Sequence, residues 1–143
     1  PPEPAAPSNP GLKATWHEFK GNKCSEIEKA PVNGTYPVED VMIPKKVKGN
    51  IGLIIKGYFN APQDDIYTFA LLSDDGSTLT IDSEQIVDND GPHGPKEIVG
   101  QKALAKGYHP MELRYFDQNG GQLKLKVTGS DGKEIPFTHL YAH

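Results

Sequence analysis

The stretch that decides the fold reads Tyr67-Thr68-Phe69-Ala70-Leu71-Leu72-Ser73-Asp74-Asp75-Gly76. Its bulky residues alternate with small or polar ones, and aromatic residues favour a pleated, half-buried surface, so the run is predicted to be a β-strand. The strand stops at two adjacent carboxylates and a glycine. Because neighbouring side chains on a strand point to opposite faces, only a turn or an unusual peptide geometry lets both carboxylates hold one ion. The junction is therefore either a tight turn or a calcium site.

The rest of the chain has the pattern of an all-β fold. Short runs with alternating apolar residues are separated by clusters of Gly, Pro, Asn and Asp. Besides the strand at 66–73, predicted strands cover residues 13–19, 51–59, 78–82, 84–88, 96–104, 107–117, 122–128 and 137–140. Residues 21–50 contain few apolar side chains and several prolines, so they are expected to form a long irregular loop or a pair of short edge strands.

Four of the predicted strands carry an apolar face that can line a core. The strand at 122–128, for example, alternates Leu123, Leu125 and Val127 with lysine and threonine. An antiparallel sheet that is solvated on one side produces this pattern, and two such sheets pack face to face. We therefore predict an all-β fold, an antiparallel β-sandwich or barrel of about eight to ten strands in a single domain.

Length, charge and hydropathy exclude several classes of protein. At 143 residues the chain fits one domain, and its mild net charge of −4, without a basic stripe, argues against a nucleic-acid partner. No apolar run approaches the roughly eighteen residues of a spanning helix, so no membrane-spanning segment is expected. Residues 1–10 include five prolines and are predicted to be a linker to an upstream part of a larger protein, or a disordered end. Residues 11–143 form the predicted domain.

The sequence does not indicate an enzyme. The single Cys24 excludes an internal disulfide, and the five histidines lack the spacing of a zinc site. Nothing resembles a nucleophile elbow, a phosphate loop or a metal-hydrolase motif. Glycosidase chemistry needs two carboxylates across a cleft, whereas the acids of this chain lie mostly in turns.

Several separated motifs occur in a characteristic order between residues 57 and 125. They are Gly57-Tyr58-Phe59, Ala61-Pro62, Tyr67-Thr68-Phe69, Ser73-Asp74-Asp75-Gly76-Ser77, Leu79, Ile81-Asp82, Val87-Asp88-Asn89, His93-Gly94, Gly107-Tyr108-His109-Pro110, Tyr115, Gly121, Leu123 and Leu125. With them the chain resembles the anthrax protective-antigen domain family, the "PA-fourteen" β module of toxins, adhesins and glycosidases. Each motif alone is weakly specific, and their order carries the resemblance.

The resemblance implies a calcium site at the acid pair. In fungal adhesins of this family the equivalent pair is joined by a cis peptide, and a later loop adds an asparagine and main-chain carbonyls. Carried over to this chain, the metal ligands are Asp74 and Asp75 with Asn119 from the loop at 117–121. The open face of the calcium ion then coordinates sugar hydroxyls. The alternative is that both segments are ordinary turns in which Asp accepts backbone N–H bonds.

Asp90 and His93 are assigned to the rim of the same ligand-binding region. They lie in a turn-rich, acidic loop, and such loops carry binding residues on rigid scaffolds. Asp90 occupies a position that is often aromatic in the family, so the loop has either lost a stacking platform or gained a ligand oxygen. His93 matches the family pattern and is expected to be a hydrogen-bonded loop residue.

The predicted function is that of a non-catalytic carbohydrate-binding or accessory module of a larger exported, glycoside-acting protein. It would bind glycan through loops at one end of the sandwich, with calcium as the cofactor. Its partners would be the glycan and a neighbouring catalytic domain in the same chain. The resemblance implies a secreted, periplasmic or cell-surface location. The alternative is a purely structural or protein-interaction module packed against that catalytic domain.

Overall fold

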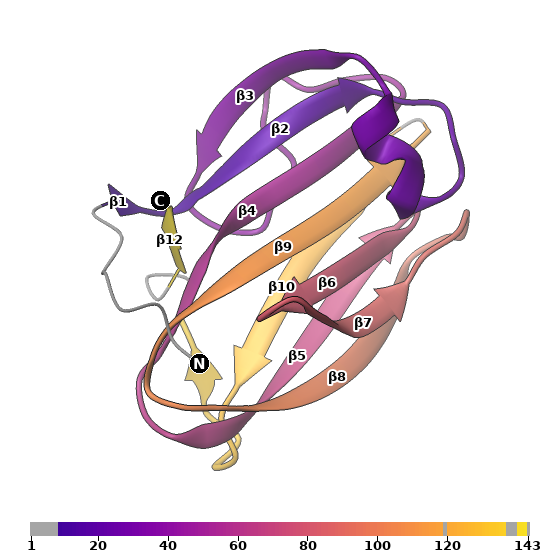
Figure 1. Cartoon of the computed structure of the whole chain (residues 1–143). Coiled ribbons are helices and arrows are strands. Elements are labelled where there is room, and N and C mark those ends of the chain that lie inside the picture. The colour runs from indigo at the N-terminus through magenta and orange to yellow at the C-terminus, as the bar shows by residue number, and fades with distance from the viewer. Residues whose placement is uncertain (1–8, 119, 137–139, 143) are drawn as a thin grey trace.

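The computed structural model describes residues 9–118, 120–136 and 140–142 (Figure 1). Its elements are β1 (Asn9–Pro10), β2 (Leu12–Glu18), the 3-10 helix η1 (Cys24–Lys29), β3 (Val32–Val38), β4 (Ile51–Ala61), β5 (Asp65–Asp74), β6 (Ser77–Ile81), β7 (Glu84–Asn89), β8 (Lys96–Leu104), β9 (Gly107–Asp117), β10 (Gln122–Thr128), β11 (Glu134–Ile135) and β12 (Leu140–Ala142).

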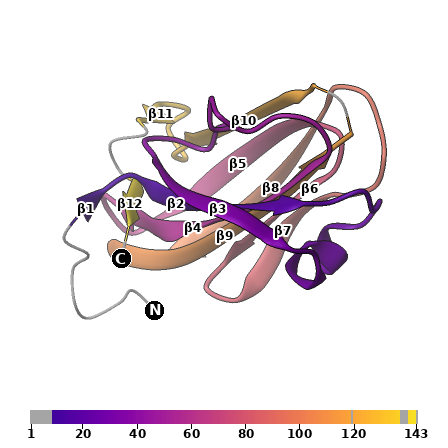
Figure 2. The ribbon, with the colours of Figure 1, turned by 90° about the horizontal axis from the view of Figure 1, so that it is seen from above.

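The strands form two antiparallel sheets that pack face to face, as Figure 2 shows from above. The eight-stranded sheet has the order β1-β12-β4-β9-β6-β7, with β2 paired to β4 and β3 paired to β2. The four-stranded sheet has the order β11-β10-β5-β8. Nine strands of the described residues are five residues or longer. The predicted all-β antiparallel sandwich in a single domain is confirmed.

The core between the sheets is built from the apolar faces that alternation predicts. Phe59 of β4 packs against Tyr67 and Phe69 of β5 with edge-to-face rings, at centroid distances of 5.3 and 5.7 Å. Leu71 and Tyr115 continue this layer and are fully buried. Edge-to-face aromatic pairs stabilise a core by about 0.5–1.5 kcal/mol beyond the burial of their area. β5 therefore lies at the centre of the fold.

Residues 21–50 differ from the prediction, which allowed a long loop or two short edge strands. The first part forms η1, whose Cys24 and Ile27 are buried against Ile54 and Phe116 on the outer face of the eight-stranded sheet. Ile54 and Phe116 point away from the main core, so this face needs its own apolar cover.

Across the described residues, no helix is long and apolar enough to cross a membrane.

The second part of this segment contains one edge strand, β3, which pairs only with β2 among the described strands. Val32 at its start is 60% exposed. An edge strand that buries little has no need of a continuous apolar face, which explains why the low apolar content of this segment hides a seven-residue strand.

The two ends of the described chain meet in one ladder. Asn9 and Pro10 form β1 and pair with Ala142 and Tyr141 of β12, so these two residues belong to the sheet and not to the predicted linker at 1–10. Residues 1–8 lie outside the described residues, and the linker there stays a prediction. The strand predicted at 137–140 is found at Leu140–Ala142, while 137–139 lie outside the described part.

Candidate functional site

Three carboxylates converge at the end of the sandwich beside η1. Asp74 ends β5, Asp75 follows it, and Asp117 ends β9, so both sheets contribute. One oxygen from each carboxylate lies within 4.8 Å of the other two. The peptide bond between Asp74 and Asp75 is cis. Asp74 and Asp75 are half-buried and Asp117 is 4% exposed, so the cluster lies at the surface with a buried floor.

The backbone carbonyl of Asp74 is fixed by contacts with Tyr115 and Gly121. The Tyr115 hydroxyl donates to the Asp74 carbonyl oxygen at 2.7 Å. Burial, reinforced by the nearby Asp117 and other acids, raises the pKa of Tyr115, so its phenol keeps the proton that it donates. Gly121 approaches from the next loop, where an added Cβ would collide with the Asp74 carbonyl and lie 2.6 Å from the Tyr115 hydroxyl oxygen. This close packing requires glycine at position 121.

The Asp75 carboxylate is oriented by two loops. The backbone N–H of His93 donates to Oδ1 at 3.1 Å, and that of Gln118 donates to Oδ2 at 3.3 Å. The His93 ring does not face Asp75. Its Nδ1 lies 2.7 Å from the Gly94 carbonyl oxygen, and its Nε2 lies 2.7 Å from the Asn89 carbonyl oxygen. The ring therefore forms hydrogen bonds within its own loop. His93 is thus a hydrogen-bonded loop residue, as its pattern predicts.

A buried amide ties this loop to the four-stranded sheet. The side-chain NH₂ of Asn89 donates to the Leu71 carbonyl at 3.2 Å and to the Lys96 carbonyl at 2.8 Å. Nearby, Gly76 packs so closely that an added Cβ would lie 2.7 Å from the backbone N and O of Gly91. The acid pair and the loop at 89–94 are therefore positioned relative to each other by backbone contact.

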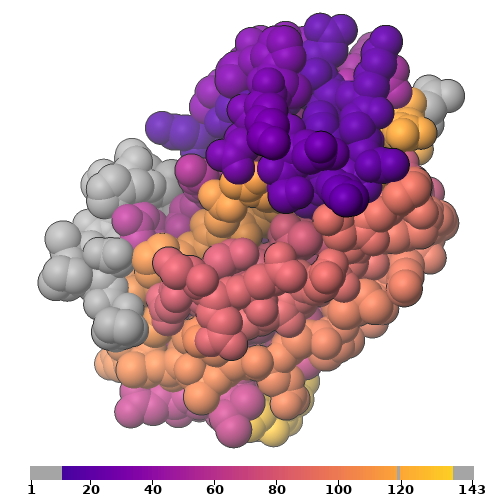
Figure 3. All heavy atoms as spheres, turned by 45° about the vertical axis from the view of Figure 1, so that its right-hand side comes forward, coloured from indigo at the N-terminus to yellow at the C-terminus, as the bar shows by residue number. Residues whose placement is uncertain are grey.

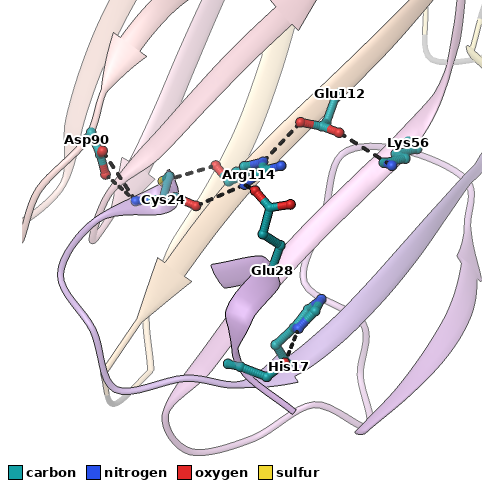
Figure 4. A network of polar contacts seen from close by, with 8 residues as sticks. His17, Cys24, Glu28, Lys56, Asp90, Glu112 and Arg114 are labelled. Carbon is teal, nitrogen blue, oxygen red and sulfur yellow. Dashed lines mark hydrogen bonds and ion pairs between the residues drawn. The ribbon is translucent and has the colours of Figure 1, made fainter. Parts of the chain in front are cut away.

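The Asp90 carboxylate points toward η1 (Figure 4). Its carboxylate accepts from the backbone N–H of Cys24 at 3.0 Å and from that of Gly91 at 2.9 Å. Lys23, at the cap position of η1, makes no side-chain capping bond, so Asp90 supplies the acceptor from a distant loop. Burial, followed by the charge of Asp90, raises the pKa of the Cys24 thiol, which stays neutral. A ligand-binding role for Asp90 stays a prediction.

Of the predicted metal ligands, the structure brings Asp74 and Asp75 together, whereas Asn119 lies outside the described residues. Asp117 is the member that the sequence analysis did not select, although it opens the predicted loop at 117–121. A signal was present, because Asp117 continues the inward-facing series of Met111, Leu113 and Tyr115 along β9. A carboxylate in an otherwise buried series needs a partner or an ion.

The donor set fits calcium. Calcium takes six to eight oxygen ligands at roughly 2.3–2.6 Å, so two oxygens on one ion lie at most about 4.6–5.2 Å apart. The three carboxylate oxygens meet this limit, since all lie within 4.8 Å of one another. The absence of thiolate or imidazole from this group of Asp74, Asp75 and Asp117 favours a hard cation over zinc.

Comparison with known proteins shows which family the chain matches. The sequence model described as "PA14 domain" matches residues 8–137. Among solved structures, a PA14 sugar-binding domain from an RTX adhesin has a TM-score of 0.79 at 16% identity, covering 95% of this chain and 100% of that chain. The Epithelial Adhesin 6 A domain from Candida glabrata, solved in complex with Galb1-3GlcNAc, has a TM-score of 0.70 at 13% identity, covering 98% and 89%.

A third solved structure, a β-glucosidase from Kluyveromyces marxianus in complex with glucose, has a TM-score of 0.66 at 18% identity. The match covers 90% of this chain but only 16% of the β-glucosidase chain. No curated protein matches the chain. At these identities the structural similarities establish the fold, and the match to the sequence model establishes the family.

Proposed function

The chain belongs to the PA14 domain family, and on that premise we propose that it is a non-catalytic carbohydrate-binding module. Glycan would bind at the end of the sandwich where Asp74, Asp75 and Asp117 meet. The observation that carries this proposal is the convergence of three carboxylate oxygens within 4.8 Å from two strand ends that are far apart in the sequence. Like charges packed this closely repel one another, so their assembly on a rigid frame favours a cation site.

Calcium is the proposed cofactor, held by Asp74, Asp75 and Asp117. Asn119 is the predicted amide ligand in the same loop as Asp117. When bound, calcium would offer its remaining coordination positions to sugar hydroxyls. The chain's own contribution is orientation: the His93 and Gln118 amides hold the two oxygens of Asp75.

The proposed setting is an exported protein, secreted, periplasmic or at the cell surface, with a glycoside-acting domain beside this module. This setting is supported by the solved structures with a similar fold, which include a sugar-binding adhesin domain, an adhesin domain in complex with a disaccharide and a β-glucosidase. Each of those properties belongs to the named protein, and its transfer to this chain is the proposal.

The test is a calorimetric titration of chelator-stripped domain with calcium, followed by a glycan array in calcium or in EDTA. Stoichiometric calcium binding that is lost in Asp75→Asn and Asp117→Asn, with array signals that need calcium, would support the proposal. Asp131→Asn is the matched control, because Asp131 lies in the β10–β11 turn and accepts a local bond from the Lys133 N–H at 2.9 Å. No calcium binding at millimolar concentration, or glycan signals equal in EDTA, would refute the calcium mechanism.

A further inference from the structure

Among the described residues, the outer face of the eight-stranded sheet has one half that is covered and one half that is open. η1 covers the half next to the carboxylate cluster. The open half carries a groove of about 580 Å³, a volume within the range of natural ligand sites. Its lining includes Lys13, Lys56, Gly57, Tyr58, Pro110 and Glu112. In Figure 3, the orange surface of β9 lies between the indigo N-terminal region and the red-pink β6–β7 hairpin.

The groove combines an apolar floor with hydroxyl groups. Tyr58 of β4 and Pro110 of β9 are register partners, so an aromatic and a pyrrolidine ring lie next to each other in the sheet. Thr80 of β6 and Ser83 of the β6–β7 turn also line the groove, and both carry a hydroxyl group. A sugar ring presents apolar C–H faces and hydroxyl edges, and this combination of surfaces suits it.

The charge along the groove favours an anionic ligand. Lys13 and Lys56 are register partners on neighbouring strands, and both side chains are exposed. Like charges directly opposite each other destabilise a sheet. Only Lys56 has an acidic partner among the described residues, namely Glu112 at 3.6 Å, and Lys13 has no ion-pair or hydrogen-bond partner there.

Glu112 cannot balance both lysines, because a third cation already shares it. Arg114 Nε lies 3.0 Å from Glu112, and Arg114 Nη1 contacts Glu28 at 3.1 Å and the Cys24 carbonyl at 3.3 Å, as Figure 4 shows. Arg114 is thereby fixed between β9 and η1. The carboxylate of Glu112 stays at the covered edge of the groove, and the ammonium of Lys13 is left for a ligand.

We propose that this groove is a second glycan-binding surface, distinct from the carboxylate cluster, that takes a short acidic oligosaccharide through its uronate carboxylates. Lys13 and Lys56 would bind the carboxylate, and Tyr58 with Pro110 would support the ring faces. An acidic peptide is disfavoured, because β2, β4, β9 and β6 are each paired on both sides and leave no backbone edge for strand addition.

The test uses trigalacturonate as the probe, titrated into the whole chain in EDTA, which removes calcium from both the protein and the uronate. Neutral galactotriose and a short polyglutamate peptide are the comparison ligands. Lys13→Gln should weaken trigalacturonate binding about tenfold, as expected when a charge-assisted hydrogen bond is lost. Lys124→Gln, which changes an exposed lysine on the other sheet, should leave it unchanged.

Selective binding of trigalacturonate with this mutant pattern, and amide NMR shifts at Gly57 and Ser83, would support the groove. Equal binding of galactotriose or of polyglutamate would overturn the acidic-sugar assignment. Binding that Lys13→Gln leaves unchanged, or no binding at all, would overturn the site. Because calcium is chelated throughout, any of these failures leaves the test of the carboxylate cluster separate.

Discussion

Replacing Asp117 by Asn should change the stability of the calcium-free and calcium-loaded domain in opposite directions. The substitution keeps the shape of the side chain and removes one charge from a cluster whose oxygens lie within 4.8 Å of one another. At this separation each charge pair costs about 0.9 kcal/mol in a water-like dielectric and about 3.5 kcal/mol at an effective dielectric constant near 20. Asp74 and Asp75 are half-exposed, which favours the lower figure.

Two relieved pairs therefore stabilise the calcium-free variant by about 2 kcal/mol. For a domain of this size that corresponds to a rise in Tm of roughly 4–8 °C in EDTA. Calcium at about one hundred times its Kd should stabilise the wild type by about 2.7 kcal/mol, and the variant should lack this increment. Differential scanning calorimetry in EDTA and in calcium measures both effects, with Asp131→Asn as the matched control.

Salt provides an independent check of the electrostatic argument. The gain of Asp117→Asn in EDTA should shrink in 1 M NaCl, where the Debye length falls to about 3 Å. A variant that keeps the full calcium-dependent rise in Tm would refute the metal site. A variant that is less stable than wild type in EDTA would show that Asp117 is a structural hydrogen-bond acceptor and that repulsion is not the dominant effect.

Two further predictions concern the frame of the carboxylate cluster, and a third concerns Asp40, which lies elsewhere in the fold. Gly76→Ala should lower Tm by several degrees, because its Cβ would meet the Gly91 backbone at 2.7 Å, whereas Gly94→Ala, with open space around its Cβ, should be nearly neutral in the same melts. Asp90→Ala should lower the free energy of unfolding in urea by about 1 kcal/mol, because it removes the acceptor of the Cys24 N–H. It should leave calcium affinity unchanged. A large loss of calcium affinity would instead make Asp90 a ligand. Burial raises the pKa of Asp40 in the folded chain, so ionisation of Asp40 reduces stability as the pH rises above its unfolded pKa. Asp40→Asn should therefore raise Tm at pH 7 and have no effect on Tm near pH 3. An equal gain in Tm at both pH values would contradict this linkage.

Much of the fold could be predicted because strand alternation is a local property. The inward-facing residues Phe59, Tyr67 and Phe69 are identifiable from a period of two, and they are the aromatic residues that meet in the core. The two elements of residues 21–50 were not predictable in the same way, because η1 is short and β3 is an edge strand with little burial. Outward-facing Ile54 was the local hint that something covers that face.

By itself, the sequence determined the all-β class, the faces of the central strands and the acid pair Asp74-Asp75 at a strand end, since each depends on neighbours along the chain. Only the tertiary structure decided that Asp117 joins this pair and that Asp90 turns to η1. It also decided that Lys13 lies opposite Lys56 in an open groove. These contacts depend on the register between strands and on the packing of two sheets, and no local periodicity encodes which distant residues those will bring together.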